Sequence, residues 1–172
     1  KITRGLTRIN AKLDKYLYVG NLDAKRDWGH ARDYVSFQWL MLQQEKPDDF
    51  VIATGRTETV RKFIEMSAKE IGWSKNSNEP AIIWEGEGIN EIGKRADSDE
   101  IVIKVDPKYF RPTEVDQLIG DPKKAFEKLG WTPETTLEEL IKEMISFDKE
   151  EALKESLLRK KGFNVSSFNE SP

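Results

Sequence analysis

Short apolar runs that predict strands alternate with longer amphipathic segments along most of this chain. Helices are predicted at residues 1–13, 35–42, 57–72, 121–130 and 136–147, and strands at residues 16–19, 50–53, 81–84 and 101–105. The run at 50–53 is apolar at every position, which is typical of a strand buried on both faces in a parallel sheet. This alternation predicts an α/β fold, in which the later short strands form a small mixed subdomain.

Residues that start and stop helices bound three of these segments. They are Thr57 and Gly72, then Asp121-Pro122 and Gly130, and then Thr136, which forms a capping box with Glu139. Residues 85–100 are polar and contain three glycines, so they predict a long loop. From residue 148 the chain is rich in charge and then in serine and asparagine. We therefore expect a domain at residues 1–147 and a frayed or disordered tail at residues 148–172.

The composition argues against several classes of function. A net charge of -3 is not typical of a general nucleic-acid-binding protein, which would carry a basic excess. The chain has no cysteine and a single histidine, so we expect neither disulfides nor a zinc centre. No run approaches the roughly 20 apolar residues of a membrane helix, and we expect a soluble cytoplasmic protein that does not contact membranes.

Basic residues that follow the first predicted strand are candidates for ligand contacts. Lys25 and Arg26 come after a Gly-Asn turn and before a predicted helix, and loops at strand ends are where α/β proteins place such contacts. An arginine there can donate two parallel hydrogen bonds to phosphate oxygens, which a lysine cannot do. The residues alone support equally well a surface ion pair of Arg26 with Asp27 or Asp33.

A second candidate region lies around Arg111. The proline after Arg111 favours an extended backbone, and Glu114 follows three residues later. A fixed arginine beside a carboxylate suits a ligand that carries both phosphate and hydroxyl groups. A structural Arg–Glu pair in a rigid loop is the alternative, which the residues alone favour slightly.

Other patterns do not predict chemistry. Gly86 and Gly88 have the spacing that begins a dinucleotide-binding loop, but Glu91 occupies the third glycine position, and acidic side chains would repel a pyrophosphate. The sequence contains no Tyr-x-x-x-Lys pattern. His30 has no evident catalytic partner, so we interpret it as a structural residue.

Two stretches nevertheless resemble one known family. They are GNLDAKRDWGHARDYV at residues 20–35 and YFRPTEVD at residues 109–116, which are similar to segments of GDP-mannose 4,6-dehydratases, within the extended short-chain dehydrogenase/reductase superfamily. Further matches are DFVIATG at 49–55, VRKF at 60–63 and GDPKKAFEKLGW at 120–131. Together they cover most of residues 1–147, whereas residues beyond 148 show no usable resemblance.

The resemblance implies a partial enzyme. The chain would supply the last part of a Rossmann-like NAD(P)-binding fold and the small mixed α/β substrate-binding subdomain. The N-terminal half of the same enzyme would bind most of the NADP and carry the Gly-rich loop and the catalytic residues, so no catalytic residue is expected here. Complete members convert GDP-mannose to GDP-4-keto-6-deoxymannose and water, and assemble as dimers or tetramers.

The resemblance also implies a pocket for the GDP-sugar. We expect Arg26 and Arg111 to clamp the diphosphate, and Glu114 to accept a hydrogen bond from a ribose hydroxyl. The full expected set of substrate-binding residues is Lys1, Gly20, Asn21, Lys25, Arg26, Arg111 and Glu114. The backbone around Gly20-Asn21 would lie against the guanine.

Three functional hypotheses remain open at this point. The first is the C-terminal half of a GDP-mannose 4,6-dehydratase, inactive alone. The second is a GDP-sugar-binding or assembly module without redox activity, and the third is a related GDP-sugar reductase or epimerase. A Gly-rich loop and a Tyr-x-x-x-Lys pair upstream of Lys1 would separate the first from the second.

Overall fold

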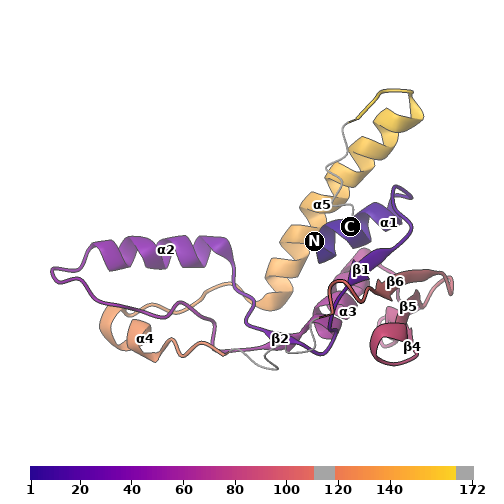
Figure 1. Ribbon diagram of the computed structural model, residues 1–172. Coiled ribbons are helices and arrows are strands. Elements are labelled where there is room, and N and C mark those ends of the chain that lie inside the picture. The colour runs from indigo at the N-terminus through magenta and orange to yellow at the C-terminus, as the bar shows by residue number, and fades with distance from the viewer. Residues whose placement is uncertain (111–118, 166–172) are drawn as a thin grey trace.

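The computed structural model describes residues 1–110 and 119–165. Its helices are α1 (Ile2–Asn10), α2 (Ala31–Leu42), α3 (Val60–Ile71), α4 (Lys123–Leu129) and α5 (Leu137–Lys160), with a short 3-10 turn η1 (Gly88–Asn90). Its strands are β1 (Leu17–Val19), β2 (Lys25–Arg26), β3 (Glu58–Thr59), β4 (Ile82–Glu85), β5 (Ile92–Arg95) and β6 (Ile101–Val105) (Figure 1). The predicted α/β class is therefore confirmed.

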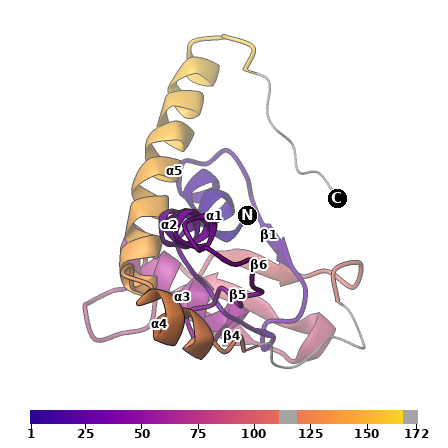
Figure 2. The same ribbon diagram turned by 90° about the vertical axis from the view of Figure 1, so that its left-hand side faces the viewer.

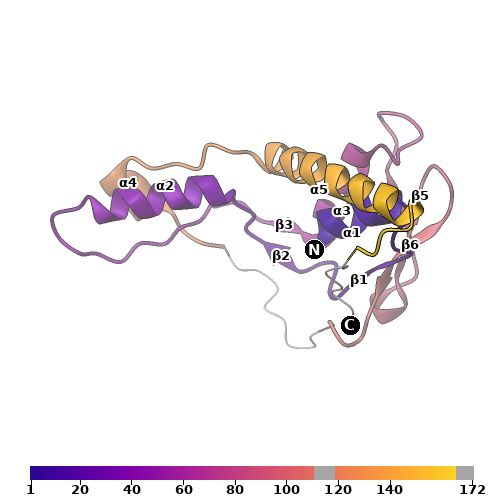
Figure 3. The ribbon, with the colours of Figure 1, turned by 90° about the horizontal axis from the view of Figure 1, so that it is seen from above.

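A four-stranded mixed sheet organises the larger part of the molecule. Its strand order is β1-β6-β5-β4, with β1 parallel to β6 and the other two pairings antiparallel. Apolar residues of β1 and β6 face the core, and the parallel register sets Leu17 opposite Ile103. Strands β2 and β3 form a separate antiparallel pair, which lies between this sheet and helices α2 and α4 (Figure 3).

The main core lies between the sheet and helices α1 and α3. Leu6, Ile64, Trp73 and Ile103 are almost completely buried in it. Helix α5 packs against both α1 and α3, as Figure 2 shows. The apolar spacing that predicts the first and third helices thus corresponds to faces that are buried against the sheet.

Helices α2 and α4 lie on an arm that extends away from the sheet (Figures 1 and 3). The arm has a small core of its own, in which the ring centroids of Phe37 and Trp131 are 4.9 Å apart. One stripe of α2, at positions i, i+4 and i+7, is left exposed. It consists of Val35, Trp39 and Leu42, which are 61–81% accessible.

The predicted strand at residues 50–53 is not formed, which corrects the expectation of a doubly buried strand. Phe50 and Ile52 pack against the arm core, whereas Val51 is 52% exposed. The segment makes no ladder with any strand among the residues the structure describes. Apolar content made these residues look like a strand, but a strand needs a partner with which to share its backbone hydrogen bonds.

Several element boundaries also differ from expectation. The predicted loop at 85–100 contains η1 and β5, because β5 pairs with β4 and β6 on either side despite Gly93. The cap of α3 is Thr59, whose hydroxyl accepts a hydrogen bond from the Lys62 backbone N–H at 3.0 Å, and not Thr57. Helix α1 ends at Asn10, and α4 begins at Lys123, whose N–H donates to the Asp121 carboxylate.

The C-terminal signals and the last cap are confirmed. Gly72 and Gly130 adopt left-handed conformations at the ends of α3 and α4, with φ of 98° and 65°. The hydroxyl of Thr136 accepts from the Glu139 N–H, and the Glu139 carboxylate accepts from the Thr136 N–H, which completes the capping box of α5. These signals are local, so they need no knowledge of the tertiary fold.

Residues 148–160 are not frayed, contrary to the prediction for the tail. They form the second half of α5, where Ala152 and Ser156 are buried. Arg8 of α1 forms an ion pair with Glu155, and the Ser156 hydroxyl donates to the Ala11 carbonyl. This part of α5 contacts α1 largely through polar residues. The apolar periodicity of the sequence therefore did not predict the contact. The division into a domain at 1–147 and a tail stays a prediction.

Candidate functional site

One cavity gathers most of the expected pocket residues that the structure describes. Its volume is about 380 Å³, and it opens between the start of α1, the end of β1, strand β2 and the start of α3. It is lined by Lys1, Ile2, Tyr18, Val19, Gly20, Asn21, Arg26, Val60 and Tyr109. Lys1, Gly20, Asn21 and Arg26 were expected from the sequence, and the fold brings them together.

Gly20 allows two backbone segments to meet at the cavity. A Cβ atom at this position would lie 2.2 Å from the carbonyl oxygen of Tyr109, so no side chain fits without moving the backbone. The N–H of Asp106 donates to the Val19 carbonyl at 2.9 Å, which holds the turn at 106–110 against the end of β1. Because Gly20 has no side chain, the backbone of Tyr109 can lie against it and form part of the cavity wall.

Tyr109 supplies an aromatic wall that was not expected from the sequence. The Lys1 ammonium lies 4.0 Å from the centroid of its ring, a distance suited to a cation–π contact. Tyr18 of β1 also lines the cavity and was equally unexpected. Tyr109 stands two residues before Arg111 within the stretch that carries the family resemblance, and this was the available signal.

Asn21 has its side chain partly committed to its own loop. Its Oδ1 accepts a hydrogen bond from the Asp23 N–H at 2.9 Å, which leaves the side-chain NH2 group as a donor. The same loop is attached to the first turn of α3, where the N–H groups of Val60 and Arg61 donate to the carbonyls of Ala24 and Leu22.

Arg26 and Lys25 lie on β2 with opposite exposure. Successive strand residues point to opposite faces. Arg26 lines the cavity, whereas Lys25 is exposed and is not among the lining residues that the structure describes. The Arg26 Nη1 donates to the Lys25 carbonyl at 2.8 Å.

The two acidic residues considered as alternative partners of Arg26 are used elsewhere. Asp27 accepts hydrogen bonds from the Thr54 N–H, the Thr54 hydroxyl and the Gly55 N–H. Asp33 is buried and accepts from the N–H groups of Glu134 and Thr135. Both carboxylates thereby join loop segments that are far apart in the sequence.

The neighbouring residues of this stretch are structural. The Trp28 ring lies 4.4 Å from that of Phe63, and a Cβ on Gly29 would meet the Tyr34 hydroxyl at 2.1 Å. His30 caps α2, since its Nδ1 accepts from the Arg32 N–H at 3.0 Å. The structural interpretation of His30 is therefore confirmed.

Arg111 and Glu114 lie outside the described residues. Tyr109 and Phe110 lead the chain from the cavity wall toward them. Their expected roles as diphosphate clamp and ribose contact stay predictions.

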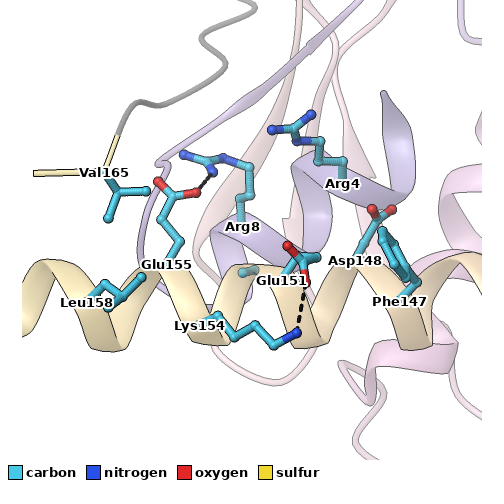
Figure 4. Close-up of a pocket in the computed structure, with 10 residues that line it drawn as sticks. Arg4, Arg8, Phe147, Asp148, Glu151, Lys154, Glu155, Leu158 and Val165 are labelled. Carbon is cyan, nitrogen blue, oxygen red and sulfur yellow. Dashed lines mark hydrogen bonds and ion pairs between the residues drawn. The ribbon is translucent and has the colours of Figure 1, made fainter.

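A second cavity of about 400 Å³ lies between α1 and α5 (Figure 4). Arg8 contacts Asp14 and Glu155, and Lys154 pairs with Glu151 at 3.0 Å. The hydrogen bond to Asp14 and the ion pair with Glu155 raise the pKa of Arg8 above its ordinary value. The three basic lining residues Arg4, Arg8 and Lys154 are matched by the three acidic residues Asp148, Glu151 and Glu155, so the formal charges of the lining sum to zero.

Gly86 and Gly88 lack the surroundings of a dinucleotide-binding loop. Both have positive φ, but Gly86 directly follows β4 and Gly88 begins the three-residue turn η1. This turn leads into β5 and not into a helix that could direct its N-terminus at a phosphate. In the described ranges, no group of three or more His, Cys, Asp or Glu side chains is arranged to hold a metal ion. Within the part of the chain that the structure describes, no helix is long and apolar enough to cross a membrane.

Comparison with solved structures defines the class of fold. The structure of RMD from Pseudomonas aeruginosa complexed with NADPH superimposes with a TM-score of 0.64 at 19% identity, covering 87% of this chain and 41% of that one. UDP-glucose 4-epimerase from Bifidobacterium longum, in complex with NAD+ and UDP, gives a TM-score of 0.61 at 16% identity, covering 89% and 40%. The fold is that of a part of the extended short-chain dehydrogenases/reductases.

Sequence comparison then gives the family. Residues 1–144 match the model of the GDP-mannose 4,6 dehydratase family, and the chain belongs to this family. The GDP-mannose 4,6-dehydratase of Yersinia enterocolitica is 51% identical over 181 aligned residues, which are 99% of this chain and 47% of that protein. The chain thus spans less than half the length of this relative. The match reaches past residue 148, where no resemblance was expected from the sequence.

Proposed function

We propose that this chain is the GDP-sugar-binding part of a GDP-mannose 4,6-dehydratase, an NADP-dependent lyase that forms GDP-4-keto-6-deoxymannose and water. The observation that carries the proposal is the convergence of Lys1, Gly20, Asn21 and Arg26 on one cavity. These residues come from the start of the chain, the end of β1 and strand β2. Family membership supports the substrate class.

The cationic residues of the cavity suit a nucleoside diphosphate. A diphosphate that leaves water needs both charge compensation and directional donors. Arg26 supplies a planar guanidinium that can donate to two phosphate oxygens, and Lys1 adds a second positive charge beside Tyr109. In the proposed complex, Arg111 completes the clamp and Glu114 accepts from the ribose.

The cavity walls also suit the uncharged parts of the ligand. Tyr18, Tyr109 and Val60 supply apolar and aromatic surface beside the polar loop at Asn21. The small Gly20 lets the turn at Tyr109 pack closely against the end of β1, which holds this aromatic wall beside the polar loop. The chain's own contribution is therefore to bind and orient the GDP-sugar.

The redox step belongs to another part of the enzyme in this proposal. The loop with Gly86 and Gly88 lacks the helix that would face the pyrophosphate of NADP. We assign the exposed stripe of Val35, Trp39 and Leu42 to contact with the N-terminal part. The complete enzyme would then assemble as a dimer or tetramer. We expect the chain alone, given NADP and GDP-mannose, to form no 4-keto product.

Calorimetric titration of the chain with GDP tests this proposal. Arg26→Ala is expected to weaken binding by about 10- to 150-fold, the equivalent of about 1.5–3 kcal/mol for a hydrogen bond to a charged group. Lys62→Ala removes one positive charge from an exposed position of α3 and is the matched control, since Lys62 is neither an expected site residue nor a lining residue of the cavity. An equal loss of GDP affinity in both variants would show that Arg26 contributes only its positive charge and no specific contact.

A GDP-sugar-binding module without redox activity is the second candidate. It would use the same cavity and the same contacts from Lys1, Asn21 and Arg26. Detection of a 4-keto product after the N-terminal part of the Yersinia relative is added would decide for the enzyme.

A further inference from the structure

Arg61 joins three parts of the molecule beside the candidate site. It is the second residue of α3. Its guanidinium contacts Asp23, in the loop at residues 21–24 (the site loop), and Glu91, in the turn before β5. The guanidinium carbon also lies 4.9 Å from the centroid of the Trp84 ring. Arg61 has no role in the predicted pocket or in the proposed function.

The contacts on the sheet side fix the orientation of the guanidinium. Glu91 is buried and pairs with Nη1, and its second oxygen accepts from Nη2 at 3.1 Å. The Trp84 ring is held in turn, because its Nε1 donates to Glu65 of α3 at 2.9 Å. Hydrogen bonding to Glu91 is the main cause that raises the pKa of Arg61 above its ordinary value, so the group stays charged.

The contacts on the other side hold the site loop. The Arg61 Nε and Nη2 donate to the Asp23 Oδ1 at 3.1 and 2.9 Å. The Arg61 backbone N–H donates to the Leu22 carbonyl at 2.8 Å. This loop begins at Gly20-Asn21 and leads directly into β2, so its position sets where Asn21 and Arg26 meet the cavity.

We propose that Arg61 is a positioning residue for the nucleotide site: it anchors the loop at residues 21–24 to the sheet through Asp23 and Glu91. The inference rests on the proposed function, since the loop matters for binding only if the cavity holds the GDP moiety. Arg61 itself does not line the cavity. Its effect on the ligand therefore passes through Asn21 and Arg26.

Because the Asp23 side chain is exposed, a substitution there can change the position of the loop with little effect on the free energy of folding. The Asp23 side chain is 73% exposed, so its ion pair contributes little to the free energy of folding. Truncating Arg61 would instead leave Glu91 buried without its partner, and the variant would lose stability for that reason alone. Asp23→Ala is consequently the informative substitution.

GDP titration of Asp23→Ala tests the inference. We expect the Kd to rise about three- to tenfold because the loop is less well positioned, with a melting temperature within about 1 °C of the wild type. Asp23→Asn keeps an oxygen acceptor for Arg61 and is expected to recover most of the affinity. Asp97→Ala is the matched control, because it breaks the pair between Arg95 of β5 and Asp97 of the following turn, neither of which lines the cavity.

Hydrogen exchange gives a readout that does not depend on the ligand. The amides of Val60 and Arg61 donate to the loop carbonyls, so Asp23→Ala should accelerate their exchange while Asp97→Ala should not. Unchanged exchange together with an unchanged Kd, in a chain that still responds to Arg26→Ala, overturns the inference and leaves the proposed function standing. A wild-type chain that does not bind GDP overturns both.

Discussion

Gly20 occupies the point where the end of β1 and the turn at Tyr109 touch. A Cβ there would lie 2.2 Å from a backbone oxygen, and backbone cannot move aside as the end of a flexible side chain can. We expect Gly20→Ala to destabilise the chain by about 1–3 kcal/mol, as overpacking does, and to weaken GDP binding because Tyr109 is displaced. Urea unfolding and GDP titration measure the two effects.

Gly88→Ala is the control for this substitution. Gly88 has open space around its Cβ position and a φ of 58°, so alanine meets only conformational strain. We expect a smaller destabilisation and no change in the Kd for GDP. Equal effects of the two substitutions on GDP affinity would contradict the role given to Gly20.

The residue scale is where sequence reasoning alone was weakest. From the residues alone, Arg26 was equally compatible with a surface ion pair, and the family resemblance raised it to a site residue. The structure places Arg26 on the cavity, and Asp27 and Asp33 accept hydrogen bonds from other loop segments. The role of Arg26 in binding stays a prediction. Tyr109 was missed, because its place in the wall depends on contacts between residues far apart in the chain.

At the scale of elements, the second half of α5 makes the sharpest prediction. Ala152 is buried, whereas its neighbour Leu153 is 49% exposed. Ala152→Asp should destabilise the chain by about 1–3 kcal/mol, because it places a larger, partly desolvated polar group where α5 packs, and Leu153→Asp by no more than about 0.5 kcal/mol. Thermal unfolding that responds equally to the two substitutions would show that this segment is not packed.

The capping box of α5 makes stability depend on pH. Hydrogen bonds from the Thr136 N–H and then its hydroxyl lower the pKa of Glu139 below its ordinary value. A lowered pKa contributes stability above the unfolded-state value of about 4.3, and this contribution is lost as the pH falls through the folded-state value. Glu139→Gln should therefore lower the melting temperature at pH 7, and the difference from wild type should shrink toward pH 3.

Circular dichroism melts across this pH range measure the effect. Thr136→Ala, which removes the hydroxyl from the same cap, is expected to cost about 1 kcal/mol at pH 7. A difference between wild type and Glu139→Gln that grows on acidification would contradict the expected sign of this pH dependence.

Elements with local signals were predicted well, and those that depend on partners were not. The capping box of Thr136 and the C-terminal glycines of α3 and α4 were placed correctly because their hydrogen bonds close within a few residues. The run at 50–53 and the strand β5 were mistaken for opposite reasons. The first has strand composition without a partner, and the second has loop composition with a partner on each side.

At the scale of the whole molecule, the arm and the sheet region differ in how much apolar surface they bury. The sheet region has a well-buried core around Leu6 and Ile103, and it carries the candidate site. The arm has a small core and an exposed apolar stripe on α2. In the proposed function, the sheet region would hold the nucleotide sugar and the arm would contact the rest of the enzyme.

The location of GDP on the isotope-labelled chain, mapped by NMR chemical-shift changes, tests the central claim most directly. The proposal predicts shifts at the amides of Gly20, Asn21 and Tyr109, which surround the cavity beside β1. It predicts none at Glu151 and Ala152, which line the other cavity between α1 and α5. Shifts confined to those α5 residues, or no shifts at millimolar GDP, would contradict it.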